Sequence, residues 1–327
     1  MSGPSSVTVT VPARLHFGFL DLNGDLGRRF GGIGLAIGGV RTRVVVSRGT
    51  EVTVTGADVR RARRYVEALY AALGLSGGCH VGVEEAAPAH SGLGSGTQLA
   101  LAIAAGLRRL HGLPLDVRGD AVRAGRGARS GLGVGLFDEG GVIVDGGRGA
   151  ASDTAPVVSR LPFPQDWRVV LVLDPARTGI HGDDESAAFA RLPPFAAADA
   201  AHLCRVVLMQ ALPALAEGDL QEFAAAISEM QRRLGAYFAP LQGGHGFSSP
   251  DVAGALDLLQ GEGALGRGQS SWGPTGFTFA RSATEAERLV QFARSHPRCR
   301  GLDIRACKGL NRGAEISTEP AQATAVR

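Results

Sequence analysis

The sequence is poor in cysteine and has no long apolar run. Its 327 residues include four cysteines, whose spacings match neither a metal-binding nor a redox pair, so we expect reduced thiols and no disulfide. No stretch of about 18 apolar residues occurs, and the first six residues lack the basic and apolar regions of a signal peptide. These absences predict a soluble, cytoplasmic protein with no membrane partner.

A marked excess of one charge is also missing. The 34 Lys and Arg residues are interspersed with 31 Asp and Glu residues, which leaves a net charge of +3. Because there is no basic stripe, we expect no nucleic-acid partner and favour an anionic small molecule. The chain is longer than a single core usually supports, so two domains are expected.

Glycine, in contrast, is abundant, and one glycine-rich stretch spans residues 88–97. It follows a short predicted strand over 80–84 and precedes an apolar helical run over 98–105. Glycines keep side chains out of such a turn, so backbone N–H groups can converge on an anion at the start of a helix. A turn without a ligand is the alternative. The candidate phosphate contacts are His90, Ser91, Gly92, Gly94, Ser95, Gly96 and Thr97.

Polar residues stand between apolar ones near the N-terminus. Residues 7–11 alternate as in a half-buried strand, and Arg14, His16 and Asp21 follow, placed to face a cleft. Arg28 and Arg29 precede a pair of glycines and are further candidates for anion contacts. Solvated surface arginines and a satisfied histidine at a strand edge are the alternatives.

Two later glycine-rich stretches carry polar residues. In the first, Arg126, Arg129 and Ser130 lie among glycines, with Asp138 and Glu139 a little further on. The second spans residues 263–276, and there we expect the ring of Trp272 to line an apolar pocket, with Gln269, Ser270, Ser271 and Gly273 beside it. The alternatives are loops packed under a sheet and a tryptophan that anchors its loop to the core. A loop over 174–185, which contains Glu185, offers groups for a cation or a phosphate.

Local patterns predict the remaining elements. A hairpin is expected around Gly49, from valine runs at 44–46 and 52–54, and an amphipathic helix over 59–73. A buried strand is expected over 167–173, helices near 203–210, 220–234, 252–259 and 285–295, and a mobile tail after Ser317.

Three glycine-rich motifs in this order resemble the superfamily of galactokinase, homoserine kinase, mevalonate kinase and phosphomevalonate kinase (GHMP). They span 12–24, 88–97 and 266–276. Within this superfamily, the residues at 13–18, 126–131 and 268–275 are similar to the corresponding motifs of the β-ribofuranosylaminobenzene 5′-phosphate synthases. Many GHMP kinases have an aspartate a few residues after the Ser-Gly of their middle motif, where it acts on the substrate hydroxyl. Here Leu132, Gly133 and Val134 follow Ser130-Gly131, and Asp138 comes only later.

The resemblance implies an α+β fold of two-layer sandwiches. Its N-terminal domain (1–155) would resemble domain 2 of ribosomal protein S5 and carry the phosphate-binding loop, its C-terminal domain (156–327) would be ferredoxin-like, and the site would lie between them. The implied reaction transfers phosphoribose from phosphoribosyl pyrophosphate to 4-aminobenzoate, with loss of carbon dioxide and pyrophosphate, in tetrahydromethanopterin biosynthesis. Mg²⁺ is the implied cofactor, and a homodimer is expected. An ATP-dependent small-molecule kinase and a catalytically idle metabolite sensor are the alternatives.

Under this resemblance, the glycine loop at 92–97 would hold pyrophosphate. The 5′-phosphate and carboxylate contacts would come from Arg14, Arg28, Arg29, Arg126 and Arg129. The catalytic candidates are His16, Asp21, Asp138 and Glu139, and the metal candidates are Asp138, Glu139 and Glu185. Ser130, Gln269, Ser270, Ser271, Trp272 and Gly273 would complete the substrate site, with the Trp272 ring against the aromatic acceptor.

Overall fold

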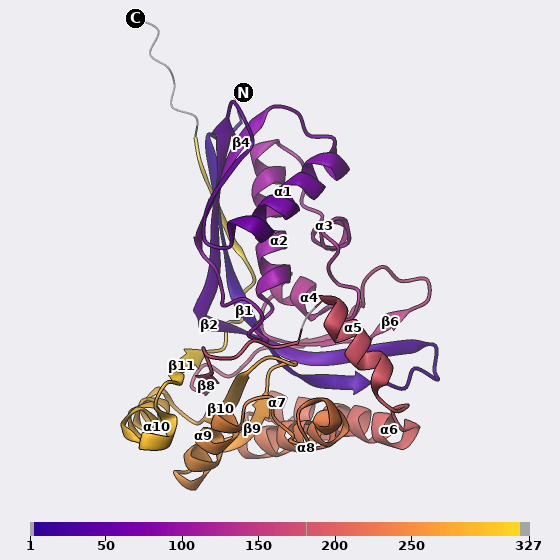
Figure 1. The fold of residues 1–327 in the computed structure, drawn as a ribbon, viewed down its shortest axis with the longest axis vertical. Coiled ribbons are helices and arrows are strands. Elements are labelled where there is room, and N and C mark those ends of the chain that lie inside the picture. The colour runs from indigo at the N-terminus through magenta and orange to yellow at the C-terminus, as the bar shows by residue number, and fades with distance from the viewer. Residues whose placement is uncertain (1–2, 181, 321–327) are drawn as a thin grey trace, which may run out of the picture.

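The computed structural model describes residues 3–180 and 182–320, with the side chains of residues 183–186 outside the description. Two α/β units are stacked along the long axis of the molecule (Figure 1). Each unit is a sheet covered by helices, which confirms the predicted α+β architecture. None of the helices in the described ranges combines the length and the apolar character that crossing a bilayer requires.

The first unit is built on a sheet of eight strands. Its main path runs β12-β1-β2-β4-β3, while β5 and β6 pair with β2, and β7 pairs with β5. The strands are β1 (Ser6–Asp21), β2 (Arg28–Gly49), β3 (Thr53–Gly56), β4 (Gly78–Glu85), β5 (Val142–Asp145), β6 (Arg148–Gly149), β7 (Val157–Leu161) and β12 (Glu315–Glu319). The alternation that predicted a strand at 7–11 is confirmed in β1, where Val7, Val9 and Val11 are fully buried.

The predicted hairpin around Gly49 is wrong. Strand β4 lies between β2 and β3, antiparallel to β2 and parallel to β3. Helix α1 (Val59–Leu73) connects β3 to β4, which is the crossover that parallel neighbours require. Local alternation therefore identified both strands but not their pairing.

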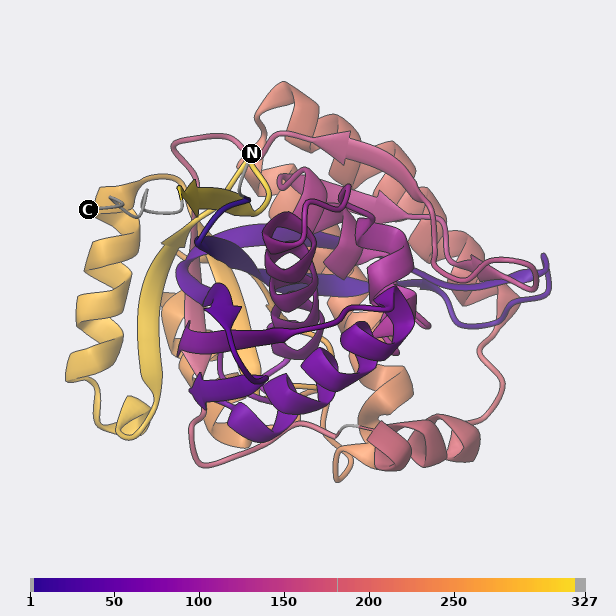
Figure 2. The ribbon, with the colours of Figure 1, turned by 90° about the horizontal axis from the view of Figure 1, so that it is seen from above.

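Helix α2 (Ser95–Leu110) is the centre of the first unit. It packs on β1 and β2 and is buried around most of its circumference. Helices α1, α3 (Val117–Arg123) and α4 (Leu132–Asp138) surround it, as seen from above in Figure 2. The predicted helix over 59–73 is confirmed, and it brings the start of α1 close to the start of α2.

The second unit is built on an antiparallel sheet of four strands in the order β11-β8-β10-β9. These are β8 (Arg168–Leu173), β9 (Leu265–Gln269), β10 (Thr275–Ala280) and β11 (Asp303–Lys308). Its helical elements are α5 (Gly182–Arg191), α6 (Ala197–Val206), η1 (Val207–Ala211), α7 (Leu212–Glu217), α8 (Leu220–Phe238), η2 (Ala239–Leu241), α9 (Pro250–Gly261), α10 (Ala283–Ser295) and η3 (Pro297–Cys299).

The two sheets share one hydrophobic core. Phe17 of β1 lies 5.3 Å from Phe277 of β10, ring centre to ring centre, and 5.9 Å from Phe223 of α8. A second core, which includes Val172, Val252 and other residues of β8, α9 and α10, covers the opposite face of the smaller sheet. The shared core fixes the two units against each other at the end of β1 that carries His16.

The chain returns to the first sheet at its end. Strand β12 pairs with β1, and β7 pairs with β5, so both belong to the first sheet although they follow residue 155. The smaller sheet begins only at β8. Of the tail after Ser317 expected to be mobile, Thr318 and Glu319 are paired in β12, and residues 321–327 lie outside the described residues.

Candidate functional site

A cleft of about 1200 Å³ opens between the start of α1, the glycine loop before α2, the 125–130 loop and the 271–273 turn. It brings together residues that lie far apart in the sequence. The sequence-predicted residues that line it are Arg14, His16, His90, Gly92, Gly94, Ser95, Gly96, Thr97, Arg126, Arg129, Ser130, Ser271, Trp272 and Gly273.

The glycine loop has the geometry of a helix start that faces a cleft. Gly92 (φ 85°) and Gly94 (φ 74°) have left-handed backbone conformations, and Gly94 is the N-cap of α2. The first N–H groups of a helix lack partners within it, and no acidic residue stands in the first turn of α2. This arrangement suits an anion, as the sequence predicted. Ser91 supports the loop instead of lining the cleft, because its hydroxyl donates to the Pro88 carbonyl at 2.8 Å.

Arginine dominates the charge of the cleft. The lining guanidinium groups are those of Arg14, Arg60, Arg61, Arg64, Arg126 and Arg129, whereas the lining carboxylate among the described side chains is that of Asp58. Arg61 pairs with Asp58, and Arg126 donates to Thr97 Oγ1 at 3.2 Å. Such a surplus of positive charge favours a ligand with several negative charges.

Three of these arginines were missed in the sequence. Arg60, Arg61 and Arg64 belong to the run 60–64 on the polar side of α1. A run of charges on an amphipathic helix is usually a solvated face, and no local pattern distinguishes it from a binding wall. The packing of α1 beside α2 turns this face toward the glycine loop.

The rings of Phe19 and Trp272 line one part of the cleft, its aromatic end, and further rings pack against Trp272. The Trp272 ring stacks on Phe189, with centroids 4.6 Å apart and an angle of 18°, and meets Phe238 edge-on at 4.8 Å. The Arg129 guanidinium lies 5.6 Å from the centre of the Phe189 ring. Trp272 therefore both anchors its turn and lines the cleft, which combines the two alternatives that the sequence left open.

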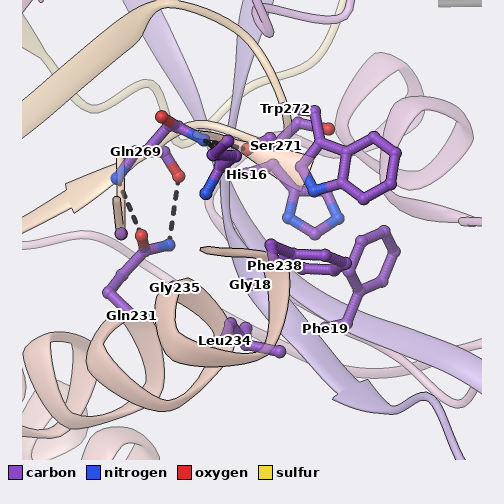
Figure 3. A pocket seen from close by; sticks show the side chains of 12 residues that line it. His16, Gly18, Phe19, Gln231, Leu234, Gly235, Phe238, Gln269, Ser271 and Trp272 are labelled. Atoms are coloured by element: carbon purple, nitrogen blue, oxygen red, sulfur yellow. Dashed lines mark hydrogen bonds between the residues drawn. The ribbon is translucent and has the colours of Figure 1, made fainter. Parts of the chain in front are cut away.

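A small second cavity of about 20 Å³ (Figure 3) adjoins this aromatic end, and one of the residues that line both spaces is His16. Its side chain is buried, and burial, together with the nearby Arg14 guanidinium, holds its pKa well below the usual range. The imidazole is therefore neutral near pH 7. The backbone N–H of His16 donates to Ser270 Oγ at 3.0 Å, and Ser270 Oγ donates to the Gly92 carbonyl at 2.7 Å. Ser270 thus joins β1 to the glycine loop without lining the cleft.

Glutamines connect the wall of the small cavity. Gln231 of α8 donates to the Phe17 carbonyl at 2.5 Å and accepts from the Gln269 backbone N–H at 2.7 Å. The Gln269 side chain accepts from the Ser248 N–H at 2.6 Å and donates to Gln242 Oε1 at 3.0 Å. The structure therefore places Gln269 at the edge of the site, with its amide engaged within the protein.

Asp145 is a buried acidic residue that the sequence reasoning missed. It accepts hydrogen bonds from Ser130 Oγ, the Gly131 N–H and the Gly147 N–H, each at 3.0 Å. Burial raises its pKa to about 6, although these bonds act in the opposite direction. Asp145 holds the turn that carries Ser130 to the cleft. Its sequence signal is a single carboxylate at the end of an apolar strand.

Three predicted residues lie at the β1–β2 hairpin, outside the lining of the cleft. Asp21 accepts from the N–H groups of Asn23 and Gly24 and shapes the turn. Arg28 donates to the Gly146 carbonyl at 2.8 Å, and Arg29 donates to the Leu22 carbonyl at 3.1 Å. The catalytic role expected of Asp21 and the anion contacts expected of Arg28 and Arg29 stay predictions, because none of the three lines the cleft.

The metal candidates are not brought together. Asp138 and Glu139 are exposed at the end of α4 and do not line the cleft, and the Glu185 side chain lies outside the described residues. Within the described ranges, no group of three His, Cys, Asp or Glu residues is arranged to hold a metal ion. A Mg²⁺ site made by these three residues stays a prediction.

Comparison with known proteins agrees with the motifs. Residues 59–139 match the GHMP kinases N terminal domain, and residues 211–299 match GHMP kinases C terminal. A relative from Archaeoglobus fulgidus is 34% identical over 93% of this chain and 97% of its own length. Another, from Methanothermobacter thermautotrophicus, is 31% identical over 81% of this chain and 86% of its own. Both are named β-ribofuranosylphenol 5′-phosphate synthase.

Solved structures resemble the fold at low sequence identity. A homoserine kinase from Cytophaga hutchinsonii has a TM-score of 0.68 and 17% identity, over 97% of this chain and 99% of its own. A mevalonate diphosphate decarboxylase from Staphylococcus aureus has a TM-score of 0.66 and 14% identity, over 96% of this chain and 98% of its own. These similarities confirm the predicted two-unit GHMP fold.

Proposed function

The chain belongs to the family of the β-ribofuranosylphenol 5′-phosphate synthases, within the GHMP fold, and from this we propose that it is a decarboxylating phosphoribosyltransferase. Its donor would be phosphoribosyl pyrophosphate and its acceptor a 4-substituted benzoate. The carboxyl-bearing ring carbon bonds to C1 of the ribose as pyrophosphate departs with the electrons of the C1–O bond. Carbon dioxide then leaves, and its bonding electrons restore the aromatic ring. We place this reaction in tetrahydromethanopterin biosynthesis.

The observation that carries the proposal is the two-ended cleft. A helix start with Arg61 and Arg126 beside it suits a departing pyrophosphate, and the Trp272 and Phe19 rings in another part of the lining, with Arg129 close to them, suit an aromatic acid as the acceptor. Arg61 and Arg126 stand beside the start of α2, and Trp272 and Phe19 stand at the aromatic end. The ribose would lie between them, with C1 facing both leaving group and acceptor.

We propose that Mg²⁺ enters bound to the pyrophosphate of the donor. Mg²⁺ in phosphate sites usually keeps several waters and takes only one or two carboxylates from the protein. The cleft offers the Asp58 carboxylate and the hydroxyls of Ser95 and Thr97 near the glycine loop. That donor set fits an ion carried by the substrate, whose contribution is to neutralise charge on the leaving group.

The acceptor has two candidates. The sequence motifs resemble synthases that act on 4-aminobenzoate, whereas the names of the relatives specify a ribosylated phenol, the product expected from 4-hydroxybenzoate. Both acids carry an electron-donating group opposite the carboxyl, so either can support attack from the carboxyl-bearing carbon. The reaction class is the same for both.

A kinase of the same fold is less well supported. In that alternative, an acidic residue would be needed soon after Ser130-Gly131, but Gly133 stands there against Thr97. A Cβ on Gly133 would lie 2.7 Å from Thr97 Cγ2, which leaves no room for a carboxylate without displacing Thr97. Asp138 follows at the far end of α4, outside the cleft lining.

The test is to incubate the protein with phosphoribosyl pyrophosphate, Mg²⁺ and each acceptor labelled in its carboxyl group. We expect equimolar release of labelled carbon dioxide and pyrophosphate without ATP. Phosphorylation of a small alcohol by ATP, with no decarboxylation, would establish the kinase instead. Tight binding of phosphoribosyl pyrophosphate without turnover would establish the sensor. We also propose a homodimer in the cytoplasm, which sedimentation of the pure protein and fractionation of source cells would test.

A further inference from the structure

Three buried ring nitrogens at the aromatic end of the cleft have no hydrogen-bond partner among the described residues. They are Nδ1 and Nε2 of His16 and Nε1 of Trp272. His16 is 1% exposed and Trp272 is 6% exposed. A buried polar group without a partner costs free energy, so native proteins rarely leave one unless a ligand or water completes it.

Both side chains line the large cleft and the small cavity, so they stand where the two meet. Figure 3 shows the indole nitrogen of Trp272 on the edge of its ring that faces His16, with Phe19 and Phe238 nearby. The glutamines of this wall are engaged with one another and with the backbone. Among the described residues of this junction, His16 and Trp272 therefore carry the buried polar atoms that are left to recognise a polar atom of a ligand.

The space at this junction selects a small polar group attached to a flat ring. The small cavity, of about 20 Å³, holds one water-sized group and cannot take a ring. The large cleft has ample room for a benzoate ring beside Trp272. A ring that points its 4-substituent at His16 would turn its carboxyl-bearing carbon toward the glycine loop, where the proposed reaction needs it.

The hydrogen-bonding capacities of the two side chains identify that group. An indole N–H only donates, whereas a neutral imidazole donates from one nitrogen and accepts at the other. A hydroxyl can accept from the indole and donate to the imidazole at the same time. The nitrogen of an aromatic amine can donate to the imidazole, but its lone pair is delocalised into the ring and accepts poorly, so the indole N–H would stay unpaired.

We propose that Trp272 Nε1 and His16 bind the 4-hydroxyl group of the acceptor and select 4-hydroxybenzoate over 4-aminobenzoate. This inference rests on the proposed function, because it places the acceptor of that reaction. As the ring carbon attacks the sugar, positive charge develops on the hydroxyl oxygen, and its hydrogen bond to His16 becomes stronger. Selection therefore acts on both binding and rate.

The test measures direct binding, so that it does not depend on turnover. The enzyme with Mg²⁺ and inorganic pyrophosphate is titrated calorimetrically with 4-hydroxybenzoate, 4-aminobenzoate and unsubstituted benzoate. We expect 4-hydroxybenzoate to bind about ten-fold more tightly than 4-aminobenzoate, the factor given by one hydrogen bond of about 1.4 kcal/mol. Trp272→Phe keeps an aromatic ring but removes the N–H, and it should abolish this preference while leaving benzoate affinity nearly unchanged.

Trp167→Phe is the matched control. Trp167 is also buried, but it packs on Phe163 and Phe223 in the shared core, so its replacement should retain the ten-fold preference. His16→Phe is the second variant, used if thermal unfolding shows that Trp272→Phe is not folded. It should also lose the preference for 4-hydroxybenzoate. Equal affinities in the unmodified enzyme, or a preference that survives loss of either partner, would overturn the proposal. A preference that behaves as expected without carbon dioxide release would support recognition and refute the proposed reaction alone.

Discussion

The hydroxyl of Tyr65 lies 3.4 Å from the point that a Cβ on Gly96 would occupy, at the first turn of α2. Tyr65 is 3% exposed, and its hydroxyl has no hydrogen-bond partner among the described residues. An Arg126 guanidinium nitrogen lies 3.1 Å from the same point. A phenol donor and a guanidinium therefore pack against the first turn of α2 beside the cleft, and we propose that Tyr65 belongs to the pyrophosphate site.

Replacing this phenol gives the first prediction. Tyr65→Phe should weaken the binding of inorganic pyrophosphate about 10- to 150-fold, because a hydrogen bond to a charged group contributes about 1.5–3 kcal/mol. The free energy of unfolding should not fall, since the lost hydroxyl has no partner in the protein. Calorimetric titration and thermal unfolding measure the two effects. Tyr70→Phe, on the same helix but outside the cleft lining, is the control, and unchanged pyrophosphate affinity in Tyr65→Phe would contradict the assignment.

The second prediction concerns pH and Asp145. Burial raises its pKa to about 6 from an ordinary value of 3.8, so between these values the folded chain binds a proton that the unfolded chain has lost. The free energy of unfolding should therefore fall as pH rises through this window, by about 3 kcal/mol at pH 7. In Asp145→Asn this contribution is absent. Denaturant unfolding at pH 4–7 measures the difference in unfolding free energy between Asp145→Asn and the unmodified protein. This difference should shift in favour of the variant by about 3 kcal/mol as the pH rises. Parallel pH profiles for the two proteins would refute the raised pKa of Asp145.

Much of the local structure could be predicted from the sequence. The alternation at 7–11 gave the start of β1, and the order of strand, glycines and helix gave the loop before α2. The period of two also placed Arg14 and His16 on one side of a strand, and both line the cleft. These features depend on neighbours in the chain, which a pattern records.

What the sequence did not reveal depends on packing between distant segments. Strand β4 separates β2 and β3 because α1 crosses over the sheet, and no local signal specifies that order. Arg61 enters the cleft because α1 packs against α2. Asp145 ends an otherwise apolar strand, and its importance follows from its hydrogen bonds to the Ser130–Gly131 turn.

The third prediction tests the buried ion pair that joins α2 to α3. Arg108 donates to both oxygens of Asp120, at 2.5 and 2.8 Å, and the two side chains are 7% and 2% exposed. Asp120→Ala leaves a buried guanidinium without its main partner, so the free energy of unfolding should fall by about 3–5 kcal/mol. Because the pair lies outside the cleft lining, the Kd for phosphoribosyl pyrophosphate of the folded fraction should not change. A change in Kd of ten-fold or more would show that this pair also shapes the site.

The fourth prediction follows from the cleft lining, in which the carboxylate among the described side chains is that of Asp58. If Mg²⁺ enters with the donor, carbon dioxide release should stop after chelation and return in proportion to the concentration of the Mg²⁺ complex of phosphoribosyl pyrophosphate. The stripped protein alone should bind Mg²⁺ only weakly, in the millimolar range. Equilibrium dialysis of Mg²⁺ with the protein, with and without inorganic pyrophosphate, measures this difference. Tight binding of Mg²⁺ without pyrophosphate would point instead to a resident metal site.

The last prediction tests the glycine loop itself with two matched substitutions. Gly94 and Gly112 both have left-handed backbones, with φ of 74° and 69°, so an alanine at either position should cost about 1–2 kcal/mol of stability. Their surroundings differ. A Cβ on Gly94 would lie 2.9 Å from Arg14 Nε and 3.1 Å from Arg14 Cβ, whereas a Cβ on Gly112 would have no atom within 4 Å.

Gly94→Ala should therefore displace Arg14 and disturb the start of α2, and the affinity for phosphoribosyl pyrophosphate should fall at least ten-fold. Gly112→Ala should lose a similar amount of stability but bind with unchanged affinity. Denaturant unfolding and calorimetric titration on the same preparations separate the two effects. If the loop is only a turn, both variants will lose stability alike and both will keep their affinity, because backbone strain without a ligand contact affects folding alone.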